Sequence, residues 1–507
     1  MPRPAAKTGI PLAGKPARPV IRIRTEPSYK EDLDTSLMDH VQHEIKQGGI
    51  GWLASLGVHL IVLAILAFIV IVHDKQADAT AMIGGWINPN DLTRVRGDAK
   101  KKREAVEIEA VKLAPTPTVG AATKRAPRDD STEKASATEA GSVKPGDVSV
   151  GDALGARQGS GATRDDLIEK SGGTPQSETA VKMGLTWLQR QQKPDGHWEL
   201  QVEGEKVDVN VRTDTGATAL ALLAFLGAGH THQEGPYKTI VRKGLDWLVK
   251  QQKPNGDMHD SEEEGRTTSF YAHGQATIVL CEAYAMTRDS QLLAPAQKAL
   301  SYIYTSQHPE RGGWKYRPNS EGDLSVFGWQ LMAIQSARMA RLEVPSEVLD
   351  RAAGFLDLVQ EQNGSRYRYE QNPNLPTTPA MTAEGLLCRQ YLGWQKNHPA
   401  LRAGISYLVQ PENLPSWSNG KRNVYYWYYA TQVLHNLQGP EWEAWNTALR
   451  DEIVRNQNKV GKLAGSWHPT QPRGDRLEYG DKAGRLYVTA MCILTLEVYY
   501  RHLPLYR

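Results

Sequence analysis

One short phrase recurs six times in the second two-thirds of this chain and most constrains its fold. In each copy a Gln-rich helix end runs into a short turn with a small residue, usually followed by an aromatic. The six copies end at Trp198, Met258, Trp314, Tyr367, Trp417 and Trp467. Successive copies lie 50 to 60 residues apart. Self-similarity at a long period indicates a repeat architecture, and this period fits two helices plus a variable loop.

Two kinds of helix alternate from about residue 175 onward. The first kind is amphipathic, as in PYKTIVRKGLDWLVKQQ, with apolar residues at three- and four-residue steps. The second is more uniformly apolar, as in TGATALALLAFLGA, and such a helix is buried. Six of each predict an all-α fold over residues 175–507, in which six helical hairpins form two concentric rings, an (α/α)6 toroid.

The N-terminal third predicts a membrane anchor and a tether. Residues 51–73 include 22 positions without a formal charge, enough for a transmembrane helix across a bilayer core of ~30 Å. Eight Lys and Arg residues precede this span. We therefore expect a single-pass protein of the cytoplasmic (inner) membrane, with tail 1–50 in the cytoplasm and the toroid periplasmic. Residues 74–174 lack the apolar content to order themselves and predict a flexible linker.

Composition argues against several classes of partner and site. A net charge of +3 on 507 residues indicates no nucleic-acid partner. Cys281, Cys388 and Cys492 lie in apolar helical runs without CxxC spacing. They predict buried thiols rather than disulfides or a zinc site. We expect neither a metal nor a cofactor.

The repeated phrase resembles the QW-type repeat of the squalene cyclase and protein prenyltransferase superfamily. The clearest copies run from Gly184 to Trp198 and from Gly244 to Gly256. The resemblance covers roughly residues 175–505 and implies the toroid, but it does not imply one activity. The segments GGWKYRPNSEGDLSVFGWQ, NVYYWYYATQ and LTLEVYYRHLPLY also resemble a bacterial membrane-anchored group of unknown role.

The active-site motifs of that superfamily are incomplete in this chain. Cyclases of the family protonate an alkene with an Asp of a D-x-D-D-T-A motif. Here Thr382 and Ala383 keep the Thr-Ala but not the acids, and Glu384, as a helix-interior residue, is expected to point elsewhere. The family's zinc site needs an Asp two residues before a Cys, which none of the three cysteines has. Both inherited activities are therefore disfavoured.

Three polar residues occupy equivalent positions at the starts of successive buried helices. Asp214, His273 and Asp323 could form an acid/base cluster or part of a metal site at the toroid mouth. Alternatively, Asp214 and Asp323 are helix N-caps and His273 is a satisfied polar residue. The aligned positions in the remaining repeats are Thr378, Trp427 and Arg485.

Aromatic residues gather on the late inner helices. Such rings more often form core packing. The alternative is a ligand-facing or solvated surface, which the surplus of Tyr over Phe (20 against 5) slightly favours. Candidate ligand-lining residues are Trp427, Tyr428, Arg485 and Tyr487.

The predicted span carries Ser55 and His59, four residues apart and on one helix face. A His inside a membrane span is a functional candidate. The arrangement resembles the span of TonB-type energy transducers, which implies a proton-driven membrane motor as partner. The alternative is a plain anchor.

These observations predict a membrane-anchored toroid that binds a hydrophobic or polymeric envelope ligand without the parent catalysis. Two alternatives stay open. One is a terpenoid cyclase or prenyl transferase-like enzyme with a non-standard acid, and the other is an energy-coupled transducer acting through the membrane helix.

Overall fold

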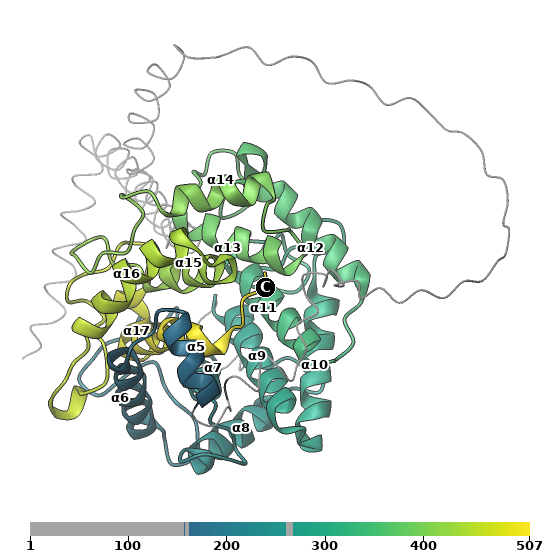
Figure 1. Cartoon of the computed structure of the whole chain (residues 1–507). Coiled ribbons are helices and arrows are strands. Elements are labelled where there is room, and N and C mark those ends of the chain that lie inside the picture. Colours follow the sequence, from purple (N-terminus) through teal and green to yellow (C-terminus); the bar gives the residue numbers. More distant parts are fainter. Residues whose placement is uncertain (1–156, 158–161, 260–266, 507) are drawn as a thin grey trace, which may run out of the picture. The chain divides into compact units, whose positions relative to one another are not determined.

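A computed structural model describes residue 157, residues 162–259 and residues 267–506 of the protein. All of them belong to one compact unit, in which two sets of helices alternate along the chain (Figure 1). The outer helices are α6 (Pro175–Gln191), α8 (Lys238–Gln251), α10 (Ser290–Ser306), α12 (Ser346–Val359), α14 (Pro399–Leu408) and α16 (Pro440–Arg455). The inner helices are α7 (Asp214–Gly227), α9 (Ser269–Thr287), α11 (Leu324–Met339), α13 (Pro379–Tyr391), α15 (Val424–Leu437) and α17 (Gly480–Leu496).

The inner helices form a closed ring. Each packs against the next, and α17 returns to α7. Every outer helix contacts the inner helix that precedes it around the ring. For α6 that helix is α17, and α6 also contacts α16, so it joins the last repeat to the first. The predicted all-α arrangement with alternating buried and amphipathic helices is thus confirmed.

Remaining elements are short. Helix α5 (Ala162–Lys170) precedes the ring and α18 (Val498–Arg501) follows it. The strands β1 (Gln360–Glu361) and β2 (Arg366–Tyr367) pair antiparallel around the 3₁₀ turn η1 (Gln362–Gly364), and η2 (Gly461–Leu463) lies in the last long loop.

The Gln of the repeated phrase joins each turn to the next repeat. The Nε2 group of Gln192 donates to the carbonyl of Gly196 in its own turn and to that of Ile240 in the next outer helix, both at 2.9 Å. The equivalent long-range bonds run from Gln252 to Pro295, from Gln307 to Val348 and from Gln457 to Ala180. Because Ala180 lies in the first outer helix, the last of these bonds closes the ring.

The Gly of the phrase allows the turn to touch the next outer helix. Gly196, Gly256, Gly312 and Gly465 all have positive φ. A Cβ atom on any of them would lie less than 3.0 Å from a carbonyl oxygen of the following outer helix, closer than real Cβ atoms approach. Both the backbone angle and the close contact therefore require Gly.

The structure corrects the boundary predicted between linker and toroid. Residues 162–170 fall inside the stretch predicted to be flexible linker, yet they form α5, which packs against α18. Arg157 lies still earlier and is buried, with its guanidinium 2.7 Å from the Glu282 carboxylate. Glu282 also lies 3.3 Å from Arg501. One buried carboxylate is therefore shared by an Arg that precedes the ring in the sequence and an Arg that follows it.

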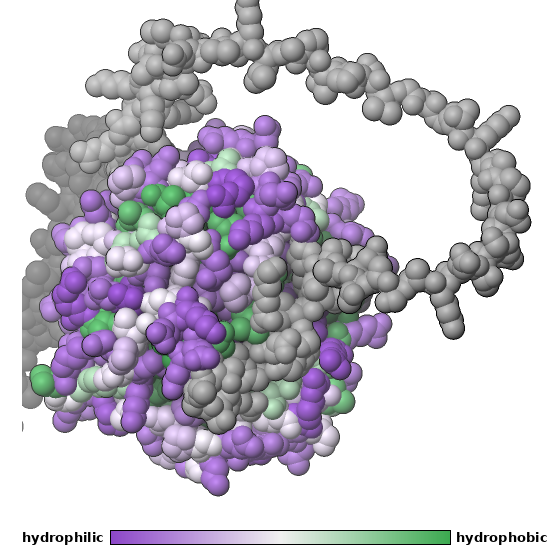
Figure 2. Space-filling model, viewed as in Figure 1, coloured by the Kyte–Doolittle hydropathy of each residue, from purple (hydrophilic) through white to green (hydrophobic). Residues whose placement is uncertain are grey.

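The other N-terminal predictions lie outside the described residues. These are the tail 1–50, the span 51–73 with Ser55 and His59, and most of the linker. Within the described parts, no helix is long and apolar enough to cross a bilayer. The visible face of the unit is mainly hydrophilic with scattered apolar residues, as amphipathic outer helices require (Figure 2).

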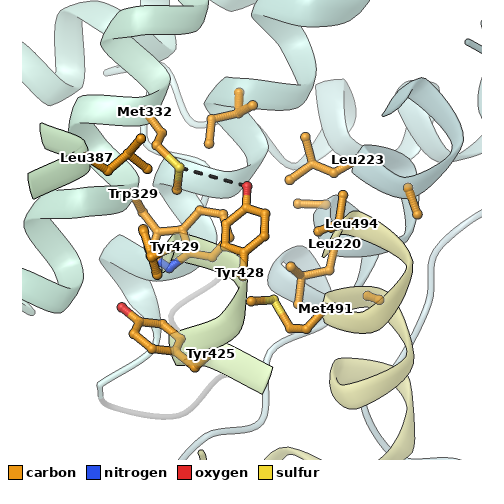
Figure 3. Close-up of a cluster of buried hydrophobic side chains, with 14 of the residues drawn as sticks. Leu220, Leu223, Trp329, Met332, Leu387, Tyr425, Tyr428, Tyr429, Met491 and Leu494 are labelled. Carbon is orange, nitrogen blue, oxygen red and sulfur yellow. Dashed lines mark hydrogen bonds between the residues drawn. The ribbon is translucent and has the colours of Figure 1, made fainter. Parts of the chain in front are cut away.

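Large side chains fill the centre of the ring. In Figure 3, Trp329 and Tyr428 lie among aliphatic residues from facing inner helices. Their rings stack with centroids 5.7 Å apart, and the Tyr428 hydroxyl donates to the Met332 sulfur at 3.8 Å. Leu220, Leu223, Leu387, Met491 and Leu494 complete this packing.

Candidate functional site

A small aromatic cavity lies where several inner helices begin. It has a volume of about 110 Å³ and is called the mouth cavity below. Inner helices α7, α9, α15 and α17 contribute residues from their first turns, and the filled centre of the ring closes it below through Leu220 and Trp329. Its aromatic lining consists of Tyr271, Tyr316, Trp329, Tyr425, Tyr479 and Tyr487.

Local sequence explains how these rings reach one place. Tyr425 is the second residue of α15, two positions after the N-cap Asn423. Tyr487 follows a kink in α17 at Gly484, where φ is 80°. Because the rings come from separate repeats, their meeting depends on closure of the ring.

Asp323 lies beside the mouth cavity as the N-cap of α11. Its Oδ1 accepts from the backbone N–H of Val326 at 2.9 Å and from the Ser325 hydroxyl at 2.8 Å. The Ser325 oxygen is 2.5 Å from the hydroxyl of Tyr271, which lines the cavity. Complete burial raises the pKa of Asp323 to about 6, although nearby Lys315 opposes that rise. The capping alternative is therefore confirmed for Asp323, in contact with the cavity lining.

Glu384 is a second buried acid behind the lining. It lies inside α13 with no exposed surface, and the Tyr425 hydroxyl donates to its Oε2 at 2.9 Å. Its side chain fills the space left by the absent Cβ of Gly328 on α11. Burial raises the pKa of Glu384 well above its usual value and so favours the neutral carboxyl. Glu384 does not itself line the mouth cavity, but it reaches the cavity lining through Tyr425.

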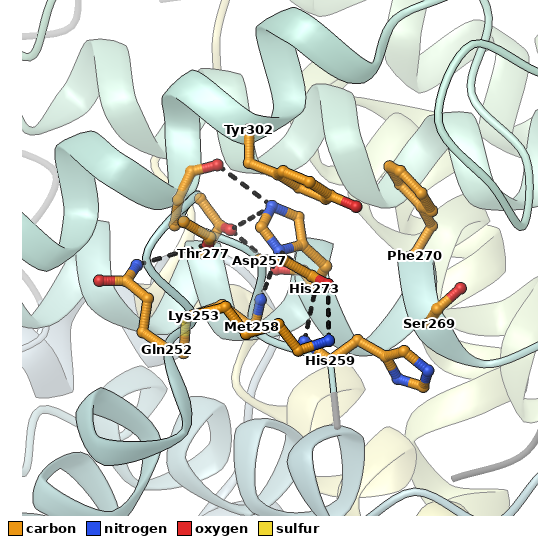
Figure 4. A network of polar contacts seen from close by, with 12 residues as sticks. Gln252, Lys253, Asp257, Met258, His259, Ser269, Phe270, His273, Thr277 and Tyr302 are labelled. Carbon is orange, nitrogen blue, oxygen red and sulfur yellow. Dashed lines mark hydrogen bonds and ion pairs between the residues drawn. The ribbon is translucent and has the colours of Figure 1, made fainter. Parts of the chain in front are cut away.

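His273 is not among the residues that line the mouth cavity, and Figure 4 shows it within a separate network of polar contacts. Its Nδ1 accepts from the backbone N–H of Met258 at 3.2 Å, and its Nε2 lies 3.1 Å from the carbonyl of Ala299. This pattern requires a neutral ring that donates from Nε2. Burial lowers the pKa of His273 to about 4. The side chain thus ties a repeated turn to an outer helix, as the alternative of a satisfied polar residue predicted.

Asp214 is in a third setting. It is the first residue of α7, and the N-cap is Thr213, so the capping prediction was wrong by one residue. Its carboxylate lies 4.0 Å from His197 in a polar groove with Trp247. Asp214, His273 and Asp323 therefore have separate sets of contacts rather than one acid/base cluster.

The four predicted ligand-lining residues are also divided. Tyr487 lines the mouth cavity, whereas Tyr428 belongs to the filled centre and to a small cavity at the opposite end. Trp427 packs on Trp417 with ring centroids 5.7 Å apart. Arg485 pairs with Glu205 at 2.5 Å. The mouth cavity is thus lined by one of these four residues.

Metal and thiol chemistry have no evident site in the described ranges. They contain no group of three or more His, Cys, Asp or Glu residues placed to hold a metal ion. The three cysteines are buried, and burial raises the pKa of each thiol.

Comparison with known proteins agrees with the repeats. The family model for the squalene-hopene cyclase C-terminal domain matches residues 167–274. Squalene–hopene cyclase of Bradyrhizobium diazoefficiens is 23% identical over 291 residues, covering 50% of this chain and 42% of its own. A probable squalene–hopene cyclase of Sinorhizobium fredii is 24% identical, covering 46% and 40%. The chain thus spans about two fifths of the length of these relatives.

Similar solved structures include two classes of enzyme. Type II terpene cyclase MstE from Scytonema, in complex with geranylgeranyl dihydroxybenzoate, is 13% identical with a TM-score of 0.42, covering 66% of this chain and 99% of its own. The GH76A α-1,6-mannanase from Salegentibacter sp. HEL1_6 is 12% identical with a TM-score of 0.45, covering 64% and 98%.

The repeats, the closed double ring and the curated relatives together define the class. The described unit is an α/α toroid that is similar, over part of its length, to squalene–hopene cyclases. Its centre is filled, and an aromatic cavity at one end lies beside two buried acids.

Proposed function

We propose that the toroid binds one end of a hydrophobic ligand in the mouth cavity and does not cyclise a long polyene. The supporting observation is the filled centre of the ring. Ligand pockets commonly measure ~300–1,000 Å³, and the mouth cavity has about 110 Å³. An engineered apolar cavity of ~150 Å³ binds benzene, so the mouth cavity suits a chain end or a head group.

The ligand comes from the cell envelope, as a lipid or an apolar segment of a polymer. This part of the proposal rests on the membrane span predicted at residues 51–73. A tethered toroid meets membrane-derived ligands at high local concentration, because a linker confines it near the bilayer.

A cavity-filling substitution tests the binding site. Ala483 is buried and lines the mouth cavity, so Ala483→Leu should abolish binding of farnesol to the purified full chain in calorimetry. Gly354→Ala on outer helix α12 is the matched control, since nothing lies within 4 Å of its added Cβ. Equal farnesol affinity in Ala483→Leu and the unsubstituted protein would contradict the site.

One observation favours a second function. Glu384 is a buried acid that accepts a hydrogen bond from Tyr425 of the cavity lining, and burial raises its pKa well above the usual value. A carboxyl whose pKa is raised by burial suits a general acid. In this alternative, the hydrogen bond between the two residues reverses: the Tyr425 hydroxyl gives its proton to the alkene of a small isoprenoid and takes a proton from the Glu384 carboxyl, which leaves a carboxylate at Glu384 and a carbocation on the isoprenoid. Gas chromatography of farnesol and squalene incubations distinguishes the two functions, because only the enzyme forms products that disappear in Glu384→Gln.

A further inference from the structure

The mouth cavity offers aromatic rings but few free hydrogen-bonding groups. The hydroxyls of Tyr316 and Tyr369 are 2.5 Å apart, and that of Tyr487 donates to the Glu478 carbonyl at 3.0 Å. Tyr271 and Tyr425 are likewise engaged with Ser325 and Glu384. A ligand that needs many hydrogen bonds, such as a sugar, would leave its own groups unpaired there.

The electrostatics of the cavity favour a positive charge. None of its lining residues among the described ones is basic. Asp323 is linked to the lining residue Tyr271 through the Ser325 hydroxyl, which lies 2.8 Å from Asp323 Oδ1 and 2.5 Å from the Tyr271 hydroxyl. After burial, the negative charge of Asp323 contributes most to the raised pKa values of Tyr271 and Tyr316. This acid therefore lies near enough to stabilise a cation among these rings.

Two of the lining rings already attract ammonium groups of the chain. The Lys482 Nζ lies 4.9 Å from the ring centroid of Tyr479, and the Lys315 Nζ lies 5.7 Å from that of Tyr316. Lys315 is neutralised by Glu370 at 2.6 Å. Lysine needs hydrogen-bond acceptors for its N–H groups, whereas a quaternary ammonium has no N–H group and binds through ring faces.

We propose that the mouth cavity is an aromatic cage for a quaternary ammonium group of the choline type. This inference rests on the proposed function, because it uses the same cavity. It specifies the chemical group at the end of the ligand that enters the cavity. Tetramethylammonium has slightly fewer heavy atoms than benzene, which fits a volume of about 110 Å³. Asp323 supplies the balancing negative charge, and the rings of Tyr271 and Tyr316 contact the methyl groups.

The decisive comparison uses choline and its neutral isostere 3,3-dimethylbutanol, in which carbon replaces the charged nitrogen. Calorimetry with the purified full chain should show choline binding at least about tenfold tighter, because desolvated cation–π contacts favour the charged ligand. Equal affinity would overturn the cage and leave the hydrophobic site standing. Binding of neither probe would overturn both proposals.

A matched pair of variants separates the ring from its hydroxyl. Tyr316→Phe keeps the ring and should bind choline within about twofold of the unsubstituted protein, whereas Tyr316→Leu should weaken choline several-fold and leave 3,3-dimethylbutanol unchanged. Should Tyr316→Leu not fold, Asp323→Asn serves instead, since Asn also caps a helix. It removes the charge and should weaken choline alone. Unchanged choline affinity in the folded Leu or Asn variant would contradict the cage.

A last arm identifies the source of the ammonium group. Dihexanoylphosphatidylcholine carries the same group on a soluble lipid, so binding tighter than choline supports a lipid head group. Equal binding supports the cage with a free solute as its ligand.

Discussion

The backbone contact that joins the last repeat to the first can be tested by adding one methyl group. Gly465 has φ of 97°, and its carbonyl accepts from Gln457 at 3.0 Å. A Cβ on Gly465 would collide with the backbone oxygen of Met183 in α6. Gly461 in the same loop has φ of 72° but nothing within 4 Å of an added Cβ. Gly461→Ala therefore measures backbone strain alone, and Gly465→Ala measures strain plus collision.

The expected sizes follow from these two terms. An L-residue in the left-handed region costs about 1–2 kcal/mol of the free energy of unfolding, which is the whole effect expected for Gly461→Ala. In Gly465→Ala the loop must also move away from α6. That movement breaks the two bonds by which Gln457 joins Gly465 to Ala180. At about 1 kcal/mol per bond, the Gly465 variant should lose roughly 3–4 kcal/mol.

Urea unfolding followed by far-ultraviolet circular dichroism measures the difference. The two variants should have separate midpoints, with Gly465→Ala unfolding at clearly lower urea. Coincident midpoints would show that the loop moves freely, and the account of ring closure through this Gly would be wrong.

Three further substitutions test buried charges. In the unsubstituted protein the folded pKa of Asp323 is about 6, above the usual 3.8, so ionisation of this carboxyl destabilises the fold as the pH rises through that range. Asp323→Asn does not ionise, so its free energy of unfolding should rise relative to that of the unsubstituted protein between pH 4.5 and 7.5. Urea midpoints at both pH values measure this. His435→Phe should raise the melting temperature, since both ring nitrogens of this buried His have no partner in the described structure. The same substitution should also make the melting temperature less sensitive to acid. The folded pKa of His435 is about 3, below its usual 6.5, so the unsubstituted protein loses stability as the pH falls through that range. An equal change in melting temperature between pH 7 and pH 5 for the two proteins would refute this. Arg157→Ala should lower the free energy of unfolding by less than the ~3–5 kcal/mol of an uncompensated buried charge, because Arg501 remains 3.3 Å from Glu282. It should still cost more than Arg164→Ala, whose pair with Glu178 is partly exposed. Equal urea midpoints for the two variants would contradict the buried pair of Arg157.

Periodicity was sufficient to predict the double ring, because each repeat carries its own pattern. It could not orient side chains on the inner helices. Nearly every residue of α13 is buried, so the helix has no exposed polar face from which the orientation of the Glu384 side chain could be predicted. That orientation depends on the space beside Gly328 in a neighbouring repeat. A single acid in an otherwise buried inner helix is the signal that could have identified it.

Long-range partners were equally invisible in the sequence. Composition indicated a linker around Arg157, yet its carboxylate partner Glu282 lies 125 residues away. The same limit applied to the mouth cavity, whose aromatic lining comes from several repeats. Asp323 could be predicted as a cap because capping is decided within one turn.

Closure of the ring through Gln457 and Ala180 fixes the number of repeats. An open array of helical pairs can gain or lose a unit at its end, because each unit contacts only its neighbours. Here the first and last units are also neighbours, so a duplicated or deleted pair would change the curvature needed at every seam. Such a chain can diverge by changes in its loops and in the residues that line its cavity. Duplication of a single repeat is not compatible with the closed ring.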